Sequence, residues 1–444
     1  MKLLLSFGFF TTALLFSNLL TVYNNGFAYF YEKKNISVQK GIQSIKITNL
    51  PRSIVVDSIV PVFEDGIDLI SQSYKNNPLN VNNLLEANLD KEVAFYSKER
   101  EKKILQGKLI NIDPPIIESQ HRYYIVKSSS IIFNTLPQNI DSKPYLVFDI
   151  DANLSKKSSV GLHYLLNDIT WRSNYTVILR NNRLNLKAWA TIINRSGKAF
   201  HNTALTLVAG NVNRHSSNIM AAPRLYRSKV LAMEANSLGA TLPKSISGYH
   251  IYKIAKRVDL LNNQTKQFVL FAANAIQYKR YAVAQNSYFG NYGERKLRFL
   301  QQITFMNTKE NGLGVPLPKG VLRIYRSKYY LGDAEIENTP KGERVKFTIG
   351  EFFDIVGKQK IIKYIVRDKY RDIETKYTLH NRGKEPIEVK LSENIPRYKD
   401  KAVFKTSCSG ICSSKKINAF SREFTIKLKA NESYSFTTEF EVYQ

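Results

Sequence analysis

Short stretches in which hydrophobic and polar residues alternate recur along the whole chain, and this two-residue period predicts β-strands. In residues 184–193 the hydrophobic residues Leu184, Leu186 and Ile192 fall on one face of an extended strand, together with Ala188 and Ala190. Similar stretches predict strands at residues 20–23, 27–31, 145–150, 171–179, 204–209, 424–428 and 434–442. The pattern therefore predicts an all-β protein with few short helices.

Two short sequences are typical of tight turns between strands. Asn24-Asn25-Gly26 and Asp65-Gly66 each supply residues that tolerate the positive φ angles of a hairpin turn. Both are therefore predicted to join neighbouring strands of a hairpin. One short helix is expected, at residues 82–87.

The length of 444 residues exceeds one typical core and predicts several domains. We expect a signal peptide at residues 1–18, an N-terminal β domain at 19–150, a β-sandwich at 151–310 and a second β-sandwich at 311–444. Short strands between residues 93 and 133 suggest a small barrel-like insert in the N-terminal domain. Residues 213–248 lack the two-residue period and are predicted to be a mobile linker.

A weak internal repeat supports sandwich modules. Residues 194–198 read Asn-Arg-Ser-Gly-Lys after one predicted strand, and residues 381–384 read Asn-Arg-Gly-Lys after another. We interpret the two segments as related immunoglobulin-like hairpins.

The N-terminus predicts export. Lys2 precedes a hydrophobic stretch at residues 3–16, which ends at Ser17 and Asn18. A short basic region followed by about 7–15 hydrophobic residues is typical of a secretory signal peptide, and the stretch is shorter than the ~20 residues of a membrane-spanning helix. A periplasmic or secreted protein that is not an integral membrane protein is expected. The alternative is a buried strand at the start of a cytosolic domain.

The formal net charge of +28 has two explanations that both stay open. Exposed lysines and arginines attract anionic polymers, and outside the cytoplasm these are envelope polymers or lipid headgroups rather than nucleic acid. Abundant lysine and asparagine can also reflect the base composition of an AT-rich genome. Under the first explanation the cations cluster on one face, and under the second they are scattered.

The two cysteines, Cys408 and Cys412, are close in sequence. In an oxidising compartment such a pair predicts a disulfide, which pins a local loop and stabilises by about 2 kcal/mol. Free thiols and a redox or metal pair are the alternatives.

No known catalytic motif is present, and the six histidines lack metal-ligand spacing. The acidic pairs Asp149 and Asp151, and Glu335 and Glu337, are expected to be solvated. No cofactor, metal or catalytic residue is predicted. One segment combines cations with tyrosine and could bind an anionic ligand; its candidate residues are Lys279, Arg280, Tyr281, Arg295, Lys296 and Arg298.

Several motifs resemble a known family. Residues 314–325 read GVPLPKGVLRIY, residues 338–343 read NTPKGE and residues 349–355 read IGEFFDI. Together with ITWRSNY at residues 169–175 they resemble the exported bacterial proteins called mucoidy inhibitor A and their relatives, which carry domain of unknown function 4139. The resemblance implies export and a β-sandwich fold and supplies no catalytic residue. Many members have a coiled-coil insertion in the N-terminal half, which this chain lacks.

The leading functional hypothesis is an exported, non-enzymatic envelope or secreted protein that binds a partner, either an envelope protein or an anionic envelope polymer. A hydrolase with an unrecognised cleft is the alternative, and a structural assembly subunit is a third. Acids or a histidine converging in a deep polar cleft would favour the hydrolase, whereas a basic or aromatic surface would favour binding.

The hydrophobic stretch after Lys2 makes export testable. Cell fractionation followed by N-terminal sequencing should recover a chain outside the cytoplasm that begins near Ser17 or Asn18. Recovery of a cytoplasmic chain that still begins at Met1 would contradict the prediction.

Overall fold

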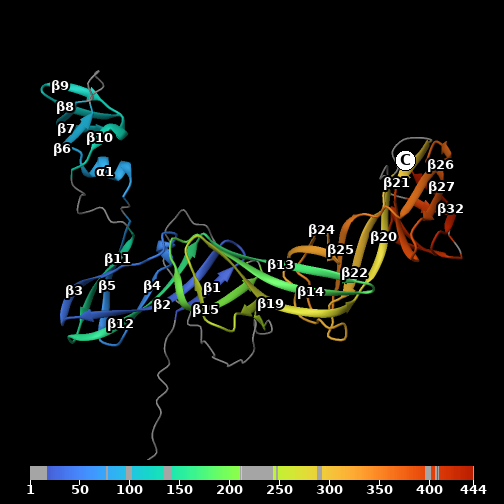
Figure 1. Cartoon of the computed structure of the whole chain (residues 1–444), viewed down its shortest axis with the longest axis horizontal. Coiled ribbons are helices and arrows are strands. Elements are labelled where there is room, and N and C mark those ends of the chain that lie inside the picture. Colours follow the sequence, from blue (N-terminus) through green and yellow to red (C-terminus); the bar gives the residue numbers. More distant parts are fainter. Residues whose placement is uncertain are drawn as a thin grey trace, which may run out of the picture. The chain divides into compact units, whose positions relative to one another are not determined.

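The computed structural model is built almost entirely of strands (Figure 1). It describes residues 18–76, 79–96, 103–134, 143–210, 212, 244–246, 249–287, 293–395, 402–405, 408 and 410–443. The mainly β fold class predicted from the sequence is confirmed. Most of the predicted signal peptide and linker lie outside the described residues.

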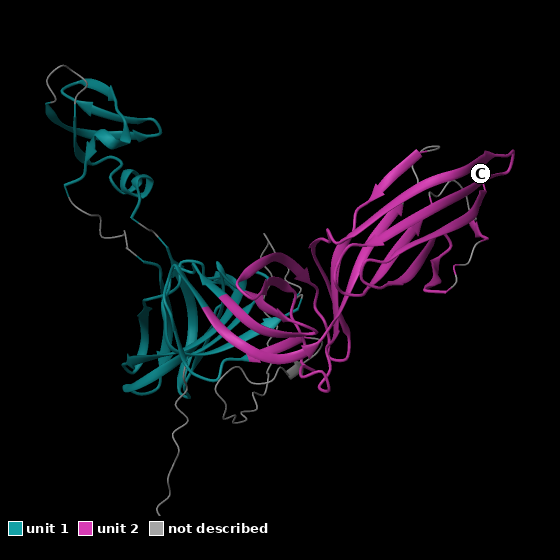
Figure 2. Ribbon diagram, turned by 45° about the vertical axis from the view of Figure 1, so that its right-hand side comes forward, with its two compact units in different colours: residues 1–171, 192–235, 253–266 teal, residues 172–191, 236–252, 267–444 magenta. Residues whose placement is uncertain are grey.

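The chain forms two compact units (Figure 2). Unit 1 comprises residues 1–171, 192–235 and 253–266, and unit 2 comprises residues 172–191, 236–252 and 267–444. The division into domains at residues 150 and 310 stays a prediction, as does the immunoglobulin-like assignment.

Unit 1 contains one large sheet, one small sheet and an insert. In sheet order the large sheet has β15 (Phe200–Ala209), β1 (Leu19–Tyr23), β2 (Phe27–Val38), β12 (Lys156–Asn167) and β4 (Val60–Phe63), with β18 (Val258–Leu260) also paired to β15. The small sheet has β3 (Gly41–Ile47), β11 (Tyr145–Ala152) and β5 (Ile67–Lys75). A 3-10 turn, Val56–Ser58, precedes β4.

The insert begins with the one helix of the described residues, α1 (Val81–Ala87), where Asn80 caps the backbone N–H of Asn83. Its sheet has the order β10 (Ile131–Ile132), β6 (Glu92–Tyr96), β7 (Ile104–Ile112), β8 (Pro115–Ser119) and β9 (Arg122–Ile125), and a 3-10 turn lies at Ser128–Ser130. Phe95, Leu109 and Leu85 form its core. Within the described residues β10 and β9 are the two edges, so the insert is an open sheet and the barrel-like expectation is wrong.

A buried ion pair lies inside unit 1. The ammonium of Lys198 donates to both carboxylate oxygens of Glu32, at 2.7 and 2.8 Å, and the hydroxyl of Tyr164 donates to the same carboxylate. Lys198 is 6% exposed and Glu32 4%. Burial lowers the pKa of Lys198 to about 8, which leaves the ammonium charged at neutral pH. Loss of the Glu32 carboxylate would leave the buried Lys198 ammonium uncompensated, at a cost of about 3–5 kcal/mol, whereas Glu32 also pairs with Lys34 at 3.2 Å.

Unit 2 contains three larger sheets. The first has β19 (Gln264–Gln277), β14 (Arg183–Asn194), β13 (Ile169–Arg180), β23 (Gly320–Arg326) and β24 (Tyr329–Ile336), and its first three strands contribute residues to both units. The six-stranded sheet has β25 (Arg344–Glu351), β22 (Leu300–Met306), β20 (Lys279–Ser287), β28 (Ile387–Asn394), β31 (Ser421–Leu428) and β30 (Cys412–Asn418). The last has β21 (Gly293–Leu297), β26 (Ile355–Val366), β27 (Tyr370–Asn381), β32 (Ser433–Tyr443) and β29 (Ala402–Phe404). A short hairpin is formed by β16 (Lys244–Ile246) and β17 (Tyr249–Lys253).

The six-stranded sheet and the β21–β29 sheet pack face to face as a sandwich. Val389 and Phe424 of the first sheet share one hydrophobic cluster with Tyr377, Leu379 and Phe436 of the second. Alternation in β28 and β31 places every second side chain in this cluster and leaves the others on the opposite face. One face of the six-stranded sheet therefore lies outside the sandwich core.

The same pairing order occurs in both units. In unit 1, β15 runs parallel to β1, β1 pairs antiparallel with β2, and β2 pairs antiparallel with β12. In unit 2, β28 runs parallel to β20, β20 pairs antiparallel with β22, and β22 pairs antiparallel with β25. The internal repeat seen in the sequence thus corresponds to a shared strand topology.

A buried asparagine stands at the strand end in each copy of the repeat. The amide nitrogen of Asn194 donates to the carbonyl of Lys198 at 2.9 Å, while its oxygen accepts from the backbone N–H of Ser196. Asn381 likewise donates to the carbonyl of Glu385 and accepts from the N–H of Gly383, both at 2.9 Å. These side chains replace sheet hydrogen bonds where the chain turns.

Three of the predicted hairpins are wrong. The strands beside Asn194 belong to different sheets, as do those beside Asn381, so each segment is a crossover. The Asp65-Gly66 turn also joins strands of different sheets, because β4 pairs with β12 and β5 pairs with β11. Turn chemistry fixes the bend but not the strand that each arm will pair with. The predicted Asn24-Asn25-Gly26 turn does connect the paired strands β1 and β2, with Gly26 at φ +88°.

Asn307, fully buried, has the same role after β22 and offers a stability test. Its amide donates to the carbonyls of Val315 and Pro340 at 2.8 and 2.9 Å, and its oxygen accepts from Gly314 N–H. Asn307→Ala should lower the free energy of unfolding by about 3 kcal/mol, because buried backbone groups lose their partners. In urea titrations the exposed control Asn35→Ala should change it by less than about 0.5 kcal/mol. Equal effects of the two substitutions would contradict this assignment.

Candidate functional site

The outward face of the six-stranded sheet is rich in cations. Strand register places on this face the cations Lys279, Arg344, Lys346, Lys390, Lys415 and Lys427 and the acids Glu351, Glu388 and Glu423. We call this surface the outer face. Paired residues on adjacent strands point the same way, so the alternation of β20, β25 and β28 brings these side chains together.

The outer face contains a groove of about 590 Å³, which we call the sheet groove. Its lining is Val283, Ala284, Gln285, Arg298, Leu300, Gln302, Thr304, Arg344, Lys346, Thr348, Lys390, Ser392 and Glu423. Four of these residues are cationic and one is acidic, so the groove favours an anionic occupant.

A second groove of about 1010 Å³, the end groove, shares Thr304 and Arg344 with the first. The rest of its lining is Asn182, Arg183, Asn274, Ala275, Gln277, Tyr278, Lys279, Tyr281, Phe305, Met306, Thr308, Glu310, Asn311 and Gly312. Three asparagines and two threonine hydroxyls accompany the cations here. Because the grooves share residues, a long ligand can pass from one to the other.

The cations of the sheet groove differ in how they are held. The carboxylate of Glu351 lies 3.3 Å from Arg298, and that of Glu423 lies 4.0 Å from Lys390. The Lys390 ammonium also lies 4.3 Å from the centre of the Tyr281 ring. Arg344 and Lys346 are exposed and form no ion pair within the described residues, so their charges face the groove without neutralisation.

Backbone strain lies beside the end groove. Ala275 has φ +58°, a conformation that costs an alanine about 1–2 kcal/mol. Asn185 accepts a hydrogen bond from its N–H and Arg183 donates one to its carbonyl, at 3.0 and 3.1 Å. Nearby, burial raises the pKa of Tyr278, whose hydroxyl donates to the carbonyl of Asn181 and stays protonated at neutral pH. Residues held in strained backbone are concentrated at functional sites.

The candidate residues chosen from the sequence fall in three places. Lys279 and Tyr281 lie on the outer face, and Arg298 lines the sheet groove. Arg280 points to the other side of β20 and binds Glu385 at 2.7 Å. Arg295 and Lys296 lie on β21, in the other sheet.

Sequence reasoning missed Arg344, Lys346 and Gln302. The alternation of Arg344, Lys346 and Thr348 along one predicted strand was a usable signal. It could not show that β25 would lie beside β22, because the register depends on the folded sheet.

Surplus cations also occur on the far side of the sandwich, where Lys296, Lys358, Lys360 and Lys376 share one face with Glu294. Positive charge by itself therefore does not select a binding face. The outer face is selected by its grooves.

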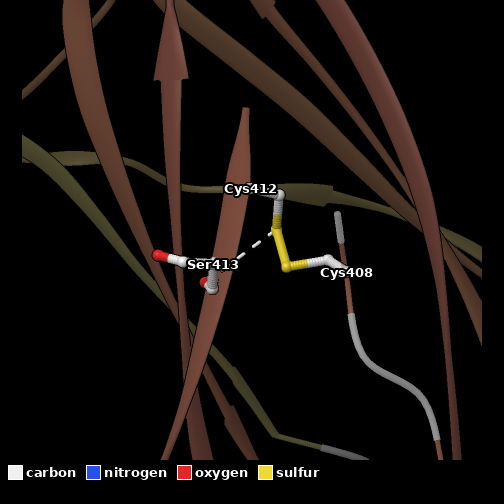
Figure 3. Close-up of a disulfide and its surroundings, with 3 residues drawn as sticks. All are labelled: Cys408, Cys412 and Ser413. Carbon is white, nitrogen blue, oxygen red and sulfur yellow. Dashed lines mark hydrogen bonds between the residues drawn. A yellow bond between two sulfur atoms is a disulfide. The ribbon is translucent and has the colours of Figure 1, made fainter. Parts of the chain in front are cut away.

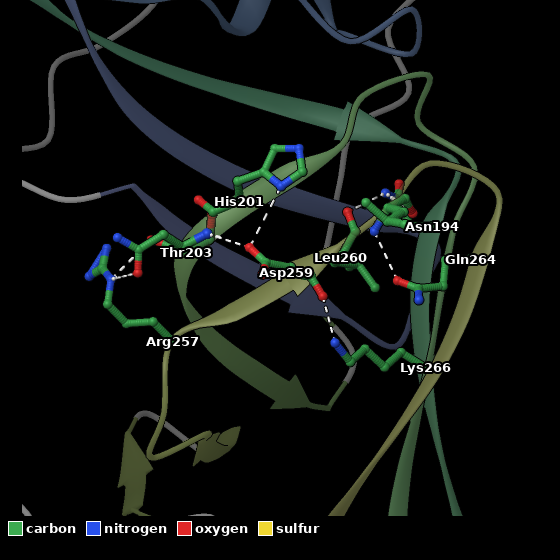
Figure 4. A network of polar contacts seen from close by, with 10 residues as sticks. Asn194, His201, Thr203, Arg257, Asp259, Leu260, Gln264 and Lys266 are labelled. Carbon is green, nitrogen blue, oxygen red and sulfur yellow. Dashed lines mark hydrogen bonds and ion pairs between the residues drawn. The ribbon is translucent and has the colours of Figure 1, made fainter.

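Three histidines, His163, His201 and His380, each form a polar contact with one side chain. His201 points toward Asp259 (Figure 4), and its Nδ1 lies 3.6 Å from the Asp259 carboxylate, which also accepts a hydrogen bond from the backbone N–H of Asn202. Both side chains of the His201 pair are about two-thirds exposed, at 67% and 65%. His380 contacts the hydroxyl of Ser433 at 2.8 Å on neighbouring strands. No group of metal-ligating side chains suited to a metal ion occurs within the described residues.

The acidic pairs have structural contacts. Asp149 accepts hydrogen bonds from the hydroxyls of Ser44 and Ser71, which lower the pKa of its carboxyl. Glu335 and Glu337 both lie near the Lys319 ammonium, at 3.6 and 2.8 Å. Neither arrangement forms a cleft with two opposed carboxyls.

The expected disulfide between Cys408 and Cys412 is present (Figure 3). Cys412 is buried in the sandwich core at the start of β30, and Cys408 packs against the same core. The bond therefore attaches the loop before β30 to the edge strand of the six-stranded sheet.

The GVPLPKG segment has a structural role. The carbonyls of Pro316 and Pro318 accept hydrogen bonds from the hydroxyls of Tyr252 and Tyr175, at 3.1 and 2.6 Å. Burial raises the pKa of both tyrosines, so they remain donors. Gly320 pairs with Ser173 in the parallel β23–β13 ladder, and a Cβ at Gly320 would collide with the Ser173 carbonyl.

These features define a mainly β protein of several sheets whose GVPLPKG segment is fixed by buried tyrosines and whose outer face carries polar grooves. The chain belongs to the family described as Domain of unknown function (DUF4139), which it matches over residues 160–443. No curated protein matches the chain. Among the described residues, no helix has both the length and the hydrophobicity needed to cross a membrane.

The strain at Ala275 can be measured. Ala275→Gly removes the strain of the positive φ angle, which stabilises the fold, but it also adds conformational entropy to the unfolded chain. The free energy of unfolding should therefore stay the same or rise by up to about 1 kcal/mol. The exposed control Ala272→Gly, in the same strand without positive φ, should lose about 0.5–1 kcal/mol. Equal losses in urea titrations would show that Ala275 is not strained.

Proposed function

We propose that this protein is an exported, non-enzymatic member of the mucoidy-inhibitor-A-like group that binds an anionic polymer on the outer face. The hydrophobic stretch after Lys2 supports export to the periplasm or the cell exterior. Export directs the proposal toward envelope polymers and away from nucleic acid.

The sheet groove is the observation that carries the proposal. It places four cations around one cavity with a single carboxylate, and two of the cations, Arg344 and Lys346, are exposed without an ion pair in the described part of the chain. Exposed, unneutralised cations in a concave surface concentrate anions and speed their association.

The alternative of a hydrolase has less support. Its best nucleophile and base pair would be Ser433 with His380, and neither residue lines the sheet groove or the end groove. A base of this kind also needs an orienting partner and a substrate site within hydrogen-bond reach.

Binding to a linear polyanion tests the proposal. Polyphosphate should bind the purified protein at about 20 mM salt and more weakly at about 150 mM, because salt screens exposed charges. Arg344→Glu combined with Lys346→Glu should weaken binding by about tenfold or more at low salt, which is about 1.4 kcal/mol.

The matched control is Lys360→Glu with Lys376→Glu, which makes the same change in charge on the far face of the sandwich. It should change the dissociation constant by less than about threefold. Equal weakening by both double variants would show that attraction is diffuse over the surface, and absence of binding at low salt would refute the proposal.

A further inference from the structure

The floor of the sheet groove contains an amide that lacks a protein partner. Gln302 is 8% exposed and lines the groove, yet its side chain forms no hydrogen bond with the described residues. An amide offers two N–H donors and a carbonyl acceptor, and those of Gln302 are open to the groove and available to an occupant. The occupant of the groove should therefore supply both an acceptor and a donor.

The neighbours of Gln302 have the same dual character. Thr304, Thr348 and Ser392 contribute hydroxyls to the groove, and Gln285 contributes another amide. Lysine and arginine can only donate, whereas hydroxyls and amides both donate and accept. This lining matches a ligand with many hydroxyl groups in addition to its negative charges.

The positions of the cations suit a repeating ligand. Lys346, Thr304 and Lys279 stand opposite one another on three adjacent strands. Strands lie about 4.8 Å apart, so the two lysines are about 10 Å apart across the sheet. The end groove continues the polar lining with Asn274 and Asn311, so both grooves offer charged and neutral polar groups.

Two other polyanions fit this surface less well. A single-stranded nucleic acid needs open aromatic rings for stacking, but Tyr281 is 8% exposed and Lys390 lies over its ring. A bilayer is flat, and its headgroups would not reach a buried amide on the floor of a groove.

We propose that the two grooves bind a linear acidic polysaccharide, whose acidic groups contact Arg344, Lys346 and Lys390 and whose hydroxyls contact Gln302. The inference rests on the proposed anion-binding function and specifies its ligand class. It predicts that uncharged groove residues contribute more to affinity for an acidic polysaccharide, which can donate and accept, than to affinity for polyphosphate, which can only accept.

Three probes test the ligand class with the purified full chain: polygalacturonate as the acidic polysaccharide, polyphosphate as a polyanion without hydroxyls, and phosphatidylglycerol vesicles. Gln302→Met keeps the size and removes the amide. It should weaken polygalacturonate binding about fivefold, as expected for one hydrogen bond, and weaken polyphosphate binding by less than about twofold. The thermal midpoint of this variant should not fall, because the amide it removes forms no hydrogen bond with the described residues.

The outcomes separate the two levels of the proposal. If polyphosphate or the vesicles bind as tightly as polygalacturonate and Gln302→Met affects none of them, the polysaccharide assignment is wrong while anion binding on the outer face stands. If none of the three probes binds at low salt, the proposed function fails as well. Selective loss of polygalacturonate binding supports the inference.

Discussion

A strand that leaves its sheet must find new partners for its backbone polar groups, and buried asparagines supply them in this protein. Asn194, Asn307 and Asn381 each donate to carbonyls and accept a backbone N–H at a strand end. Because one side chain satisfies several groups at once, the chain can cross from sheet to sheet without burying unpaired polar atoms. The order of the strands, and hence the position of the outer face, depends on these turns.

The outer face combines long-range attraction with short-range recognition. Arg344 and Lys346 provide charge that acts over about 8 Å at physiological salt. Gln302 and its hydroxyl neighbours act only on contact and distinguish one anion from another. The far face of the same sandwich has comparable charge on Lys358 and Lys360, so recognition on the outer face has to come from the groove lining.

The sequence predicted the strands well because alternation is a local property. Leu184 and Ile192 lie buried on one face of β14, as expected, and the helix near residue 82 is α1. Pairing partners were not predictable, since β4 and β5 flank a good turn yet join different sheets. The candidate site was found in part: Lys279 and Arg298 reach the grooves, whereas Arg280 points away by the same alternation that exposes Lys279.

The parallel pairing of β1 with β15 imposes a delay on folding. Leu19 is among the first described residues to be synthesised, but its ladder partner is Ala204. Until residues 200–209 have docked, this edge of β1 has no ladder partner, and an open hydrophobic strand edge favours aggregation. Two more parallel ladders join segments that are far apart in sequence: Ser173 pairs with Gly320, and Tyr281 pairs with Glu388. Each of these three ladders leaves a strand edge open until a segment distant in sequence has docked, so the topology itself makes the unfinished fold prone to aggregation.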